Sequence, residues 1–388
     1  MNQNYLQLAL DLASSATAIS PPNPPVGCAL ISLTGKIIGQ GHTQAVGGAH
    51  AEVMAIRDAI ARGESSVGAT AYVTLEPCSH FGRTPPCCNA LIEAKVAKVV
   101  IALLDPNPLV AGKGVELLKK AGIVVEVLPI DHAVAIAAKE LMIGFFSRMV
   151  RKTPWVRLKI AASLDGKTAL SNGQSQWITS QEARDDGHVW RARAGAILTG
   201  VGTILADDPM LDVRAVPTQR QPHLVIVDSA LRTPVTAKLF TINNIAAQAT
   251  NMPTRGIFIY TNSDDLEKQI TLEQLGATVI HLPSSETSDS ESSDKVNLRL
   301  ILQDLAKREI NELHVEAGAT LNGALISAGL VDEFLIYLAP KLLGIGRGLA
   351  DFELLGDLSK ATTIDFQSIE KVGPDLRILG RIPQRDCF

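Results

Sequence analysis

The sequence predicts an α/β protein of two domains, and three of its features support this class. The chain has 388 residues, which is more than one hydrophobic core usually organises. Apolar residues make up 46% of the chain but aromatic residues only 4%, so the core must consist mainly of aliphatic side chains. Short β-branched runs alternate with segments whose apolar residues recur at helical spacing, a pattern typical of helices packed on a largely parallel sheet.

The first half of the chain follows this alternation from its beginning. Pro21 and Pro22 prevent the first helix from continuing, and Gly35 lies in the turn of a predicted hairpin. Gly63 and Gly122 end the second and the fourth helix. Helices are expected over residues 5–18, 50–61, 89–94 and 113–120, and strands over residues 26–31, 36–40, 69–75, 98–103 and 124–128.

A helical run over residues 133–149 leads into a basic segment that ends at Pro154, and this segment is the predicted domain boundary. The two domains are therefore expected at residues 1–148 and 154–388. In the second domain, residues 283–295 contain no aliphatic or aromatic side chain and are predicted to be a mobile insertion. Its predicted strands cover residues 155–160, 196–199, 224–228, 256–261, 278–281, 312–316 and 333–338.

Charge and cysteine content exclude several classes of protein. With 36 basic and 40 acidic residues the chain carries a net charge of −4, which gives no general attraction to nucleic acid or to an anionic membrane. No apolar stretch approaches the ~20 residues of a membrane span, and the N-terminus lacks the features of a secretory signal. Three of the five cysteines fall within eleven residues, which favours a local metal site in a reducing cytoplasm over a disulfide framework. Chains of this composition commonly form homo-oligomers.

Three residues of the first half have the types and the order that a catalytic zinc site requires. His50 opens a predicted helix, Cys78 follows a predicted strand, and Cys87 comes nine residues later. Catalytic zinc takes three protein ligands and keeps a fourth position for water. Glu52 lies two residues beyond His50, where its carboxylate can take the proton of that water and pass it to a leaving amine. The order H-x-E followed by P-C and a further Cys is typical of zinc deaminases.

Other interpretations of these cysteines stay open at this point. A closed structural zinc site would take Cys88 or His80 as a fourth ligand in place of water. That site would give Glu52 no reason to lie so close to the histidine ligand. A nucleic-acid deaminase would separate its two cysteine ligands by two residues, whereas eight residues separate Cys78 from Cys87.

The first half resembles a known family through two segments, PPNPPVGC at residues 21–28 and PCSHFGRTPPC at residues 77–87. Both are similar to the deaminase half of the bacterial bifunctional riboflavin-biosynthesis deaminase-reductases. The resemblance implies a cytidine-deaminase-like α/β/α domain, and it makes Asn23 a contact to the substrate pyrimidine where the residues alone allow a turn. His80 and Arg83 are candidates to hold the ribose phosphate of the substrate, because an acidic protein needs local cations for it. As residues alone, both also suit solvated loop positions.

The second half lacks the Gly-x-Gly-x-x-Gly signature of a Rossmann dinucleotide site. Its best phosphate-binding candidate is HVEAGATLNGA at residues 314–324, where a strand ends near Gly318 and a helix begins near Thr320. Backbone N–H groups at a helix N-terminus point toward an anion, and the helix dipole adds to the attraction. A strand-to-helix turn with glycines for tight packing explains the same residues.

The resemblance extends through this half, where it rests on LKIAASLDGK at 158–167, SQWITS at 175–180, GTILADDP at 202–209 and VEAG at 315–318. It implies a domain similar to dihydrofolate reductase that uses NADPH. The implied cofactor contacts are Ala161, Trp177, Thr203, Asp207, Ser229, Gly318, Ala319, Thr320, Leu321, Asn322, Gly323 and Ala324. The implied substrate contacts are Ser175, Arg191, Leu211, Arg214 and Glu316.

The residue types agree with these assignments but leave alternatives. Arg191 and Arg214 provide the forked cations that a phosphate needs, and surface salt bridges are their alternative. Trp177 offers a flat face to a cofactor or a side chain to the core, and Asp207 also suits a helix terminus. Asp212 lies where the family usually has a threonine-like residue. No side chain is an evident acid for the hydride-transfer step.

The residues and the resemblance together predict a cytoplasmic bifunctional enzyme of riboflavin biosynthesis that acts on small phosphorylated pyrimidines. The N-terminal domain is expected to deaminate 2,5-diamino-6-ribosylamino-4(3H)-pyrimidinone 5′-phosphate with a zinc-bound hydroxide. The C-terminal domain is expected to reduce the ribosyl side chain to ribityl with NADPH, giving 5-amino-6-(5-phosphoribitylamino)uracil. A nucleic-acid deaminase would require a basic surface, and a zinc-stabilised binding module would not require Glu52.

Overall fold

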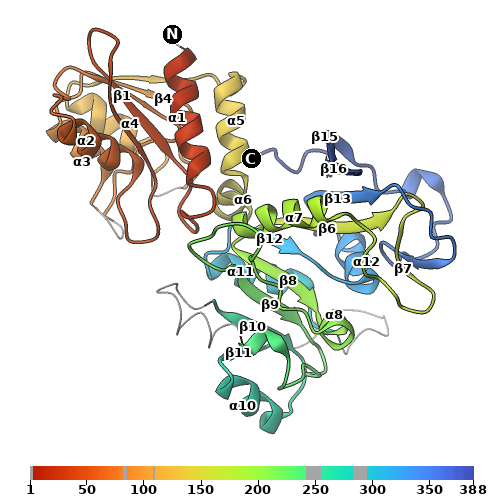
Figure 1. Cartoon of the computed structure of the whole chain (residues 1–388). Coiled ribbons are helices and arrows are strands. Elements are labelled where there is room, and N and C mark those ends of the chain that lie inside the picture. The colour runs from red at the N-terminus through yellow and green to blue at the C-terminus, as the bar shows by residue number, and fades with distance from the viewer. Residues whose placement is uncertain (1–2, 82–84, 108–109, 242–254, 283–294) are drawn as a thin grey trace. The chain divides into compact units, whose positions relative to one another are not determined.

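The computed structural model describes residues 3–81, 85–107, 110–241, 255–282 and 295–388, and it divides the chain into two compact units (Figure 1). The first unit holds residues 1–152 together with Phe388, and the second holds residues 153–387. Each unit has its own sheet and its own helices, as expected of an α/β protein. Arg83 and residues 283–294 of the predicted insertion lie outside the described residues.

A five-stranded sheet in the order β2-β1-β3-β4-β5 organises the first unit. The predicted hairpin is confirmed, because β1 pairs antiparallel with β2 across a turn in which Gly35 has a φ of +81°. The expectation of a largely parallel sheet holds only for β3, β4 and β5, since β1 pairs antiparallel with β3 as well. The strands are β1 (Gly27–Ile31), β2 (Ile37–His42), β3 (Thr70–Val73), β4 (Lys98–Ile101) and β5 (Val124–Val127).

Helices cover both faces of this sheet. A methyl group on Gly27 would lie 1.9 Å from the carbonyl oxygen of Ala9, so only glycine lets α1 approach β1 this closely. A methyl group on Gly41 would lie 2.4 Å from the carbonyl oxygen of Ala51, so α2 approaches β2 equally closely on the opposite face. The helices of the unit are α1 (Gln3–Ser15), α2 (Ala51–Ala61), α3 (Cys87–Glu93), α4 (Lys113–Lys120), α5 (Ala133–Leu141) and α6 (Ile143–Arg151).

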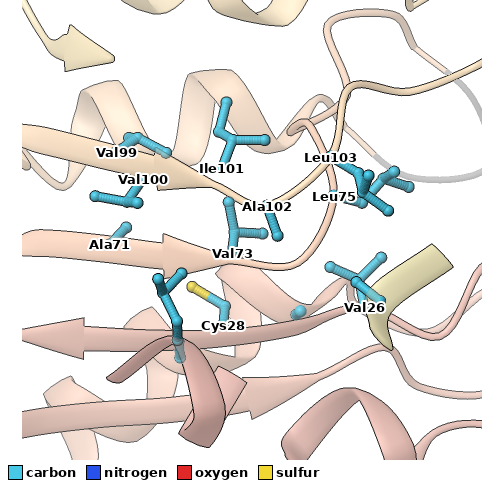
Figure 2. Close-up of a cluster of buried hydrophobic side chains, with 14 of the residues drawn as sticks. Val26, Cys28, Ala71, Val73, Leu75, Val99, Val100, Ile101, Ala102 and Leu103 are labelled. Atoms are coloured by element: carbon cyan, nitrogen blue, oxygen red, sulfur yellow. The ribbon is translucent and has the colours of Figure 1, made fainter. Parts of the chain in front are cut away.

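The core of the first unit is aliphatic, as the composition predicts. Figure 2 shows Val73, Val99 and Ile101 from neighbouring parallel strands packed together with Cys28 of β1. Cys28 is fully buried. The single helix predicted over residues 133–149 is wrong, because the chain leaves helical geometry at Met142, where φ is −108° and ψ is 12°. The buried Met142 side chain anchors this break, and glycine, a weak helix former, follows at position 144.

A nine-stranded sheet in the order β11-β10-β9-β8-β12-β6-β13-β16-β15 organises the second unit. Its strands run parallel from β11 to β13, and β16 and β15 add an antiparallel hairpin at one edge. The seven predicted strands are present, whereas β7, β14, β15 and β16 were not predicted. The nine strands are β6 (Trp155–Ser163), β8 (Ala196–Gly200), β9 (His223–Val227), β10 (Ile257–Thr261), β11 (Ala277–His281), β12 (Glu312–Val315), β13 (Glu333–Ala339), β15 (Asp365–Val372) and β16 (Asp375–Arg381). The strands β7 (Lys167–Leu170) and β14 (Gly346–Gly348) form a separate antiparallel pair.

The two faces of this sheet differ in chemistry. One face packs Leu158, Leu313 and other aliphatic side chains against α11 and α12. The opposite face is apolar over β8 to β11, beneath α8 and α10, but carries charged residues over β12, β6 and β13, beneath α7. The helices are α7 (Gln181–Arg193), α8 (Val201–Asp207), α10 (Leu266–Gln274), α11 (Leu298–Lys307) and α12 (Ala319–Ser327), with short 3₁₀ turns at Lys238–Phe240 and Leu358–Lys360.

The charged layer is organised around Arg157, whose side chain is almost completely buried. Its guanidinium donates to Glu312 Oε2 at 2.8 Å and to Glu333 Oε2 at 2.5 Å. Arg193 and Arg381 pair with the same two glutamates from the ends of the layer, each at 2.9 Å. Because buried charges need partners, these residues depend on one another.

Candidate metal centre and reductase site

The structure brings the three predicted metal ligands of the first unit together. His50 Nδ1 lies 3.6 Å from Cys78 Sγ and 3.3 Å from Cys87 Sγ, and the three ligand atoms lie within 4.8 Å of one another. Zinc bonds of about 2.0–2.3 Å in tetrahedral geometry separate neighbouring ligand atoms by about 3.5 Å. The donor set and its spacing therefore fit zinc without rearrangement.

Local structure explains how residues far apart in the sequence meet here. His50 is the N-cap of α2, Cys78 follows the end of β3, and Cys87 is the first residue of α3. The backbone N–H of Cys87 donates to Cys78 Sγ at 3.3 Å, which ties the start of α3 to the loop that follows β3. Two ligands thus lie at the starts of helices and the third lies in a loop.

The two cysteines differ in protonation. The contact with the Cys87 thiol and the His50 ring lower the pKa of Cys78 to about 4, although burial acts in the opposite direction. The same contact between the two sulfurs, together with burial, raises the pKa of Cys87. Cys78 is therefore a thiolate at neutral pH, and zinc binding would displace the proton of the second thiol.

Glu52 lies in the first turn of α2, two residues after the histidine ligand, and is 3% exposed. Burial raises its pKa, and the negative charge of Cys78 raises it further. A carboxyl group whose pKa is raised is better suited to both accept and return a proton. The arrangement provides three ligands and one proton carrier in a water-poor site.

The alternative of a closed four-ligand site is not supported. Cys88 is buried, and its thiol donates to the carbonyl oxygens of Pro77 at 3.3 Å and Gly114 at 3.7 Å, away from the other cysteines. His80 is exposed and lies outside the ligand group formed by the described residues. Asn23 lies in the turn before β1, where its backbone N–H donates to Ser20 at 2.9 Å.

Sequence reasoning missed a second buried glutamate, Glu76, which lies two residues before Cys78. Its carboxylate accepts backbone N–H groups from Asp105 at 3.3 Å, Gly112 at 3.0 Å and Val115 at 3.1 Å. These bonds attach the segment after β4 and the start of α4 to the metal-binding loop. A glutamate directly before the P-C pair was the available signal in the sequence.

In the second unit, several predicted cofactor contacts lie at one edge of the sheet. Because β8, β9 and β12 run parallel, the residues that follow them emerge at their common carboxyl edge. Thr203 lies on α8 after β8, Ser229 follows β9, and Gly318 follows β12. The edge of a parallel sheet is the usual place for a nucleotide.

The start of α12 fits a phosphate. Gly318 is its N-cap without a side-chain cap, and a methyl group on Gly318 would meet no atom within 4 Å, so the space before the first turn is open. Thr320 donates to Asp351 Oδ2 at 2.8 Å, and Asn322 donates to the Leu349 carbonyl at 2.8 Å. Residues 318–324 therefore form the turn and first helical residues that a cofactor phosphate requires.

Arg191 and Glu316 form a two-point ion pair, with Nε to Oε1 at 2.5 Å and Nη2 to Oε2 at 2.9 Å. Arg191 Nη1 donates to the carbonyl oxygen of Asp212 at 2.9 Å, so each of its three nitrogen atoms donates to a protein acceptor. Arg214 pairs with the Asp212 carboxylate, and its side chain remains 56% exposed. The Arg191–Glu316 ion pair is partly buried, since the Arg191 side chain is 15% exposed.

The remaining predicted contacts lie in different environments. Leu211 is buried in the apolar cluster beneath α8, and its backbone carbonyl oxygen accepts a hydrogen bond from Arg255 Nη1 at 2.6 Å. Trp177 is 62% exposed with Arg184 over its ring at 4.4 Å, so the core alternative is wrong. Ser175 and Ala161 are half-buried, and Asp207, the last residue of α8, is exposed.

Lys159 is a further residue that sequence reasoning missed. It lies on β6, half-buried, with Glu316 and Arg191 as its charged neighbours. Burial lowers its pKa. Charged or titratable residues at alternate positions of β6 and β12 could have predicted this buried lysine, because residues two apart on a strand lie on the same face of the sheet.

Two families match the chain, one in each half. Residues 1–103 match the cytidine and deoxycytidylate deaminase zinc-binding region, which contains the three candidate metal ligands. Residues 154–378 match the RibD C-terminal domain, which contains all of the predicted reductase contacts. Among the described residues, no helix has the length and apolar character needed to cross a membrane.

Individual relatives resemble the whole chain. The riboflavin biosynthesis protein RibD of Escherichia coli K12 is 42% identical over 97% of this chain and 98% of its own length, and that of Aquifex aeolicus VF5 is 39% identical over the same shares. A solved structure of Acinetobacter baumannii RibD covers 98% of both chains with a TM-score of 0.83 and 37% identity. The Thermotoga maritima diaminohydroxyphosphoribosylaminopyrimidine deaminase/5-amino-6-(5-phosphoribosylamino)uracil reductase covers 98% of both chains with a TM-score of 0.80 and 30% identity.

Proposed function

Because the chain belongs to the RibD family, we propose roles for the residues of its two sites in a zinc-dependent deamination and an NADPH-dependent reduction in riboflavin biosynthesis. This membership confirms both predicted activities and both predicted cofactors. We assign the deaminase to residues 1–148 and the reductase to residues 154–388, and the break between the compact units after Lys152 supports these limits. The observation that carries the assignment is the triad of ligands with a buried glutamate beside it.

In the deaminase, His50, Cys78 and Cys87 hold the metal, whose contribution is to activate a water molecule as the nucleophile at neutral pH. Glu52 accepts a proton from that water and delivers it to the amine that leaves as ammonia, so that a C–N bond is exchanged for a C–O bond. The raised pKa of Glu52 suits both transfers. Asn23 binds the pyrimidine, and His80 with Arg83 holds the ribose phosphate.

In the reductase, residues 318–324 bind a cofactor phosphate, while Ala161, Trp177, Thr203, Asp207 and Ser229 line the rest of the cofactor. NADPH held there would supply the hydride that converts the ribosyl side chain to ribityl, with the ring of the sugar opening at O4′. A proton must then reach O4′. We assign this role to Lys159, because burial lowers its pKa and Glu316 lies next to it.

The substrate contacts divide into two groups. Arg191 holds Glu316 in place, since all of its nitrogen atoms are engaged by protein partners. Arg214 has an exposed side chain beside Asp212 and is therefore the residue we assign to the substrate phosphate. Ser175 and the backbone of Leu211 complete the substrate site.

We further propose that the enzyme is a cytoplasmic homo-oligomer. All five cysteines are free, which agrees with a reducing compartment. The edge strand β15 exposes Phe366 to 62% and Ile369 to 56%, and exposed apolar side chains on an edge strand favour association. Sedimentation of the purified chain tests this, and a monomer at all accessible concentrations would contradict it.

The proposed function is tested by zinc analysis and two assays on one purified protein. We expect one zinc ion per chain, ammonia release from the diaminopyrimidine substrate, and NADPH oxidation only after that substrate is deaminated. NADPH oxidation with the diamino substrate as fast as with its product would contradict the proposed order.

A further inference from the structure

A buried histidine lies directly behind the substrate-facing edge of the reductase and has no part in the roles assigned above. His314 is on β12, between Glu312 and Glu316 on the same face of the strand, and it is 1% exposed. Its environment is charged, because Arg157 of the neighbouring strand β6 and Arg191 of α7 lie beside it. Burial and these two cations lower its pKa, so the ring is neutral and carries one N–H group.

A carboxylate lies close to the His314 ring. His314 Nε2 lies 3.4 Å from Glu316 Oε1, and among the described residues neither ring nitrogen has a hydrogen bond of good geometry. A buried N–H group without an acceptor destabilises a protein. The tautomer with its hydrogen on Nε2 reduces this loss, because it points the N–H group toward the carboxylate at 3.4 Å.

An aliphatic side chain at this buried position would need no hydrogen-bond partner. Leu313 and Val315, the immediate neighbours on β12, are fully buried against the opposite face. Apolar packing therefore does not explain the polar ring at position 314, whose Nε2 lies 3.4 Å from a residue of the proposed reductase site. Oε1 of Glu316 also accepts the Arg191 Nε–H group, so the carboxylate is approached from two sides.

We propose that His314 is a positioning residue for Glu316 in the reductase reaction: its Nε2–H group donates to Oε1 and holds the carboxylate from the sheet while Arg191 holds it from α7. The inference rests on the proposed role of Glu316 as a substrate contact. It assigns no contact between His314 and either substrate or NADPH.

A double-mutant cycle on the full-length enzyme tests this role. The variants are His314→Leu, Glu316→Gln and the double variant, and the measured quantity is kcat/KM for the deaminated substrate at saturating NADPH. We expect His314→Leu to lower kcat/KM about tenfold in the wild-type background but less than about twofold in the Glu316→Gln background. The dissociation constant of NADPH is expected to stay unchanged, which also shows that each variant is folded.

His314→Gln is the matched conservative variant, because its amide N–H group can reach the same oxygen without a charge. We expect it to keep kcat/KM within about threefold of wild type. Equal losses from His314→Leu in both backgrounds, or His314→Gln as impaired as His314→Leu, would show that His314 serves only the fold. Failure of the proposed function has a different signature, since the wild-type enzyme itself would not oxidise NADPH with the deaminated substrate.

Discussion

Replacing Glu52 with glutamine separates the two activities of the chain. Glutamine has nearly the same shape, so the three metal ligands stay in place and zinc is expected to remain bound at one ion per chain. The side chain is 3% exposed, and burial raises the pKa of the native carboxyl group. Because the substitution removes an ionisable group from a buried position, we expect no loss of thermal stability.

The expected loss of deamination follows from the number of proton transfers. One general acid–base group contributes about 10²–10⁴-fold to a rate, and Glu52 serves two transfers in succession. A reduction near 10⁴-fold, which corresponds to about 5.5 kcal/mol in the activation barrier, is therefore expected. The reductase has its own sheet in a separate compact unit, so its rate is expected to stay close to wild type.

Two assays on one preparation measure both results: ammonia release from the diaminopyrimidine, and absorbance at 340 nm with NADPH and the deaminated substrate. Glu93→Gln is the matched control, because it makes the same change on the exposed surface of α3 and should leave both rates unchanged. Ammonia release within about tenfold of wild type would refute the proton-carrier role. Loss of both activities with zinc and fold intact would refute the independence of the two units.

Four further substitutions test other parts of the argument. Cys78→Ser should abolish zinc binding and deamination, because a hydroxyl group replaces a thiolate ligand, and full zinc content by metal analysis would contradict the ligand assignment. Arg157→Met should lower the free energy of unfolding in urea by up to about 3–5 kcal/mol, since it removes the cation that Glu312 and Glu333 share and leaves each glutamate with one arginine partner at the end of the layer, and an unchanged midpoint would show that the layer is not interdependent. Arg214→Ala should raise KM for the deaminated substrate about tenfold or more with KM for NADPH unchanged, whereas equal increases would place it at the cofactor. Gly323→Ala would put a methyl group 1.9 Å from the Asp351 carbonyl oxygen. It should therefore weaken NADPH binding and lower the free energy of unfolding by about 1–3 kcal/mol in calorimetry. Wild-type values of both would show that the backbone around Asp351 moves to accommodate the methyl group.

The metal centre shows how much a local sequence pattern can predict. The identity and order of the ligands and the position of Glu52 relative to His50 follow from residue types and from the geometry of one helical turn. The triad therefore lies where the sequence predicts it. Glu76 was not predicted, because its three backbone partners lie 29 to 39 residues away in the chain.

The reductase site shows the opposite case. The sequence could not show whether the Arg191 guanidinium binds a phosphate or a carboxylate of the protein, because its partner Glu316 is 125 residues away in the chain. The antiparallel hairpin β15–β16 escaped prediction because β15 is exposed on both faces and lacks apolar alternation.

The sequence by itself determined the α/β class, the division of strands and helices into two domains, and the types of the zinc ligands. Each of these follows from patterns that extend over only a few neighbouring residues, namely the spacing of apolar residues, the spacing of His50 and Glu52, and the spacing of Cys78 and Cys87. Only the tertiary structure decided which strands are neighbours, and so which charged side chains share a buried layer. The order β12-β6-β13 places Glu312, Arg157 and Glu333 side by side beneath α7 although they are far apart in the chain. A buried charge is stable only with a partner, and partners at such separations are brought together by the pairing of strands, which no local pattern contains.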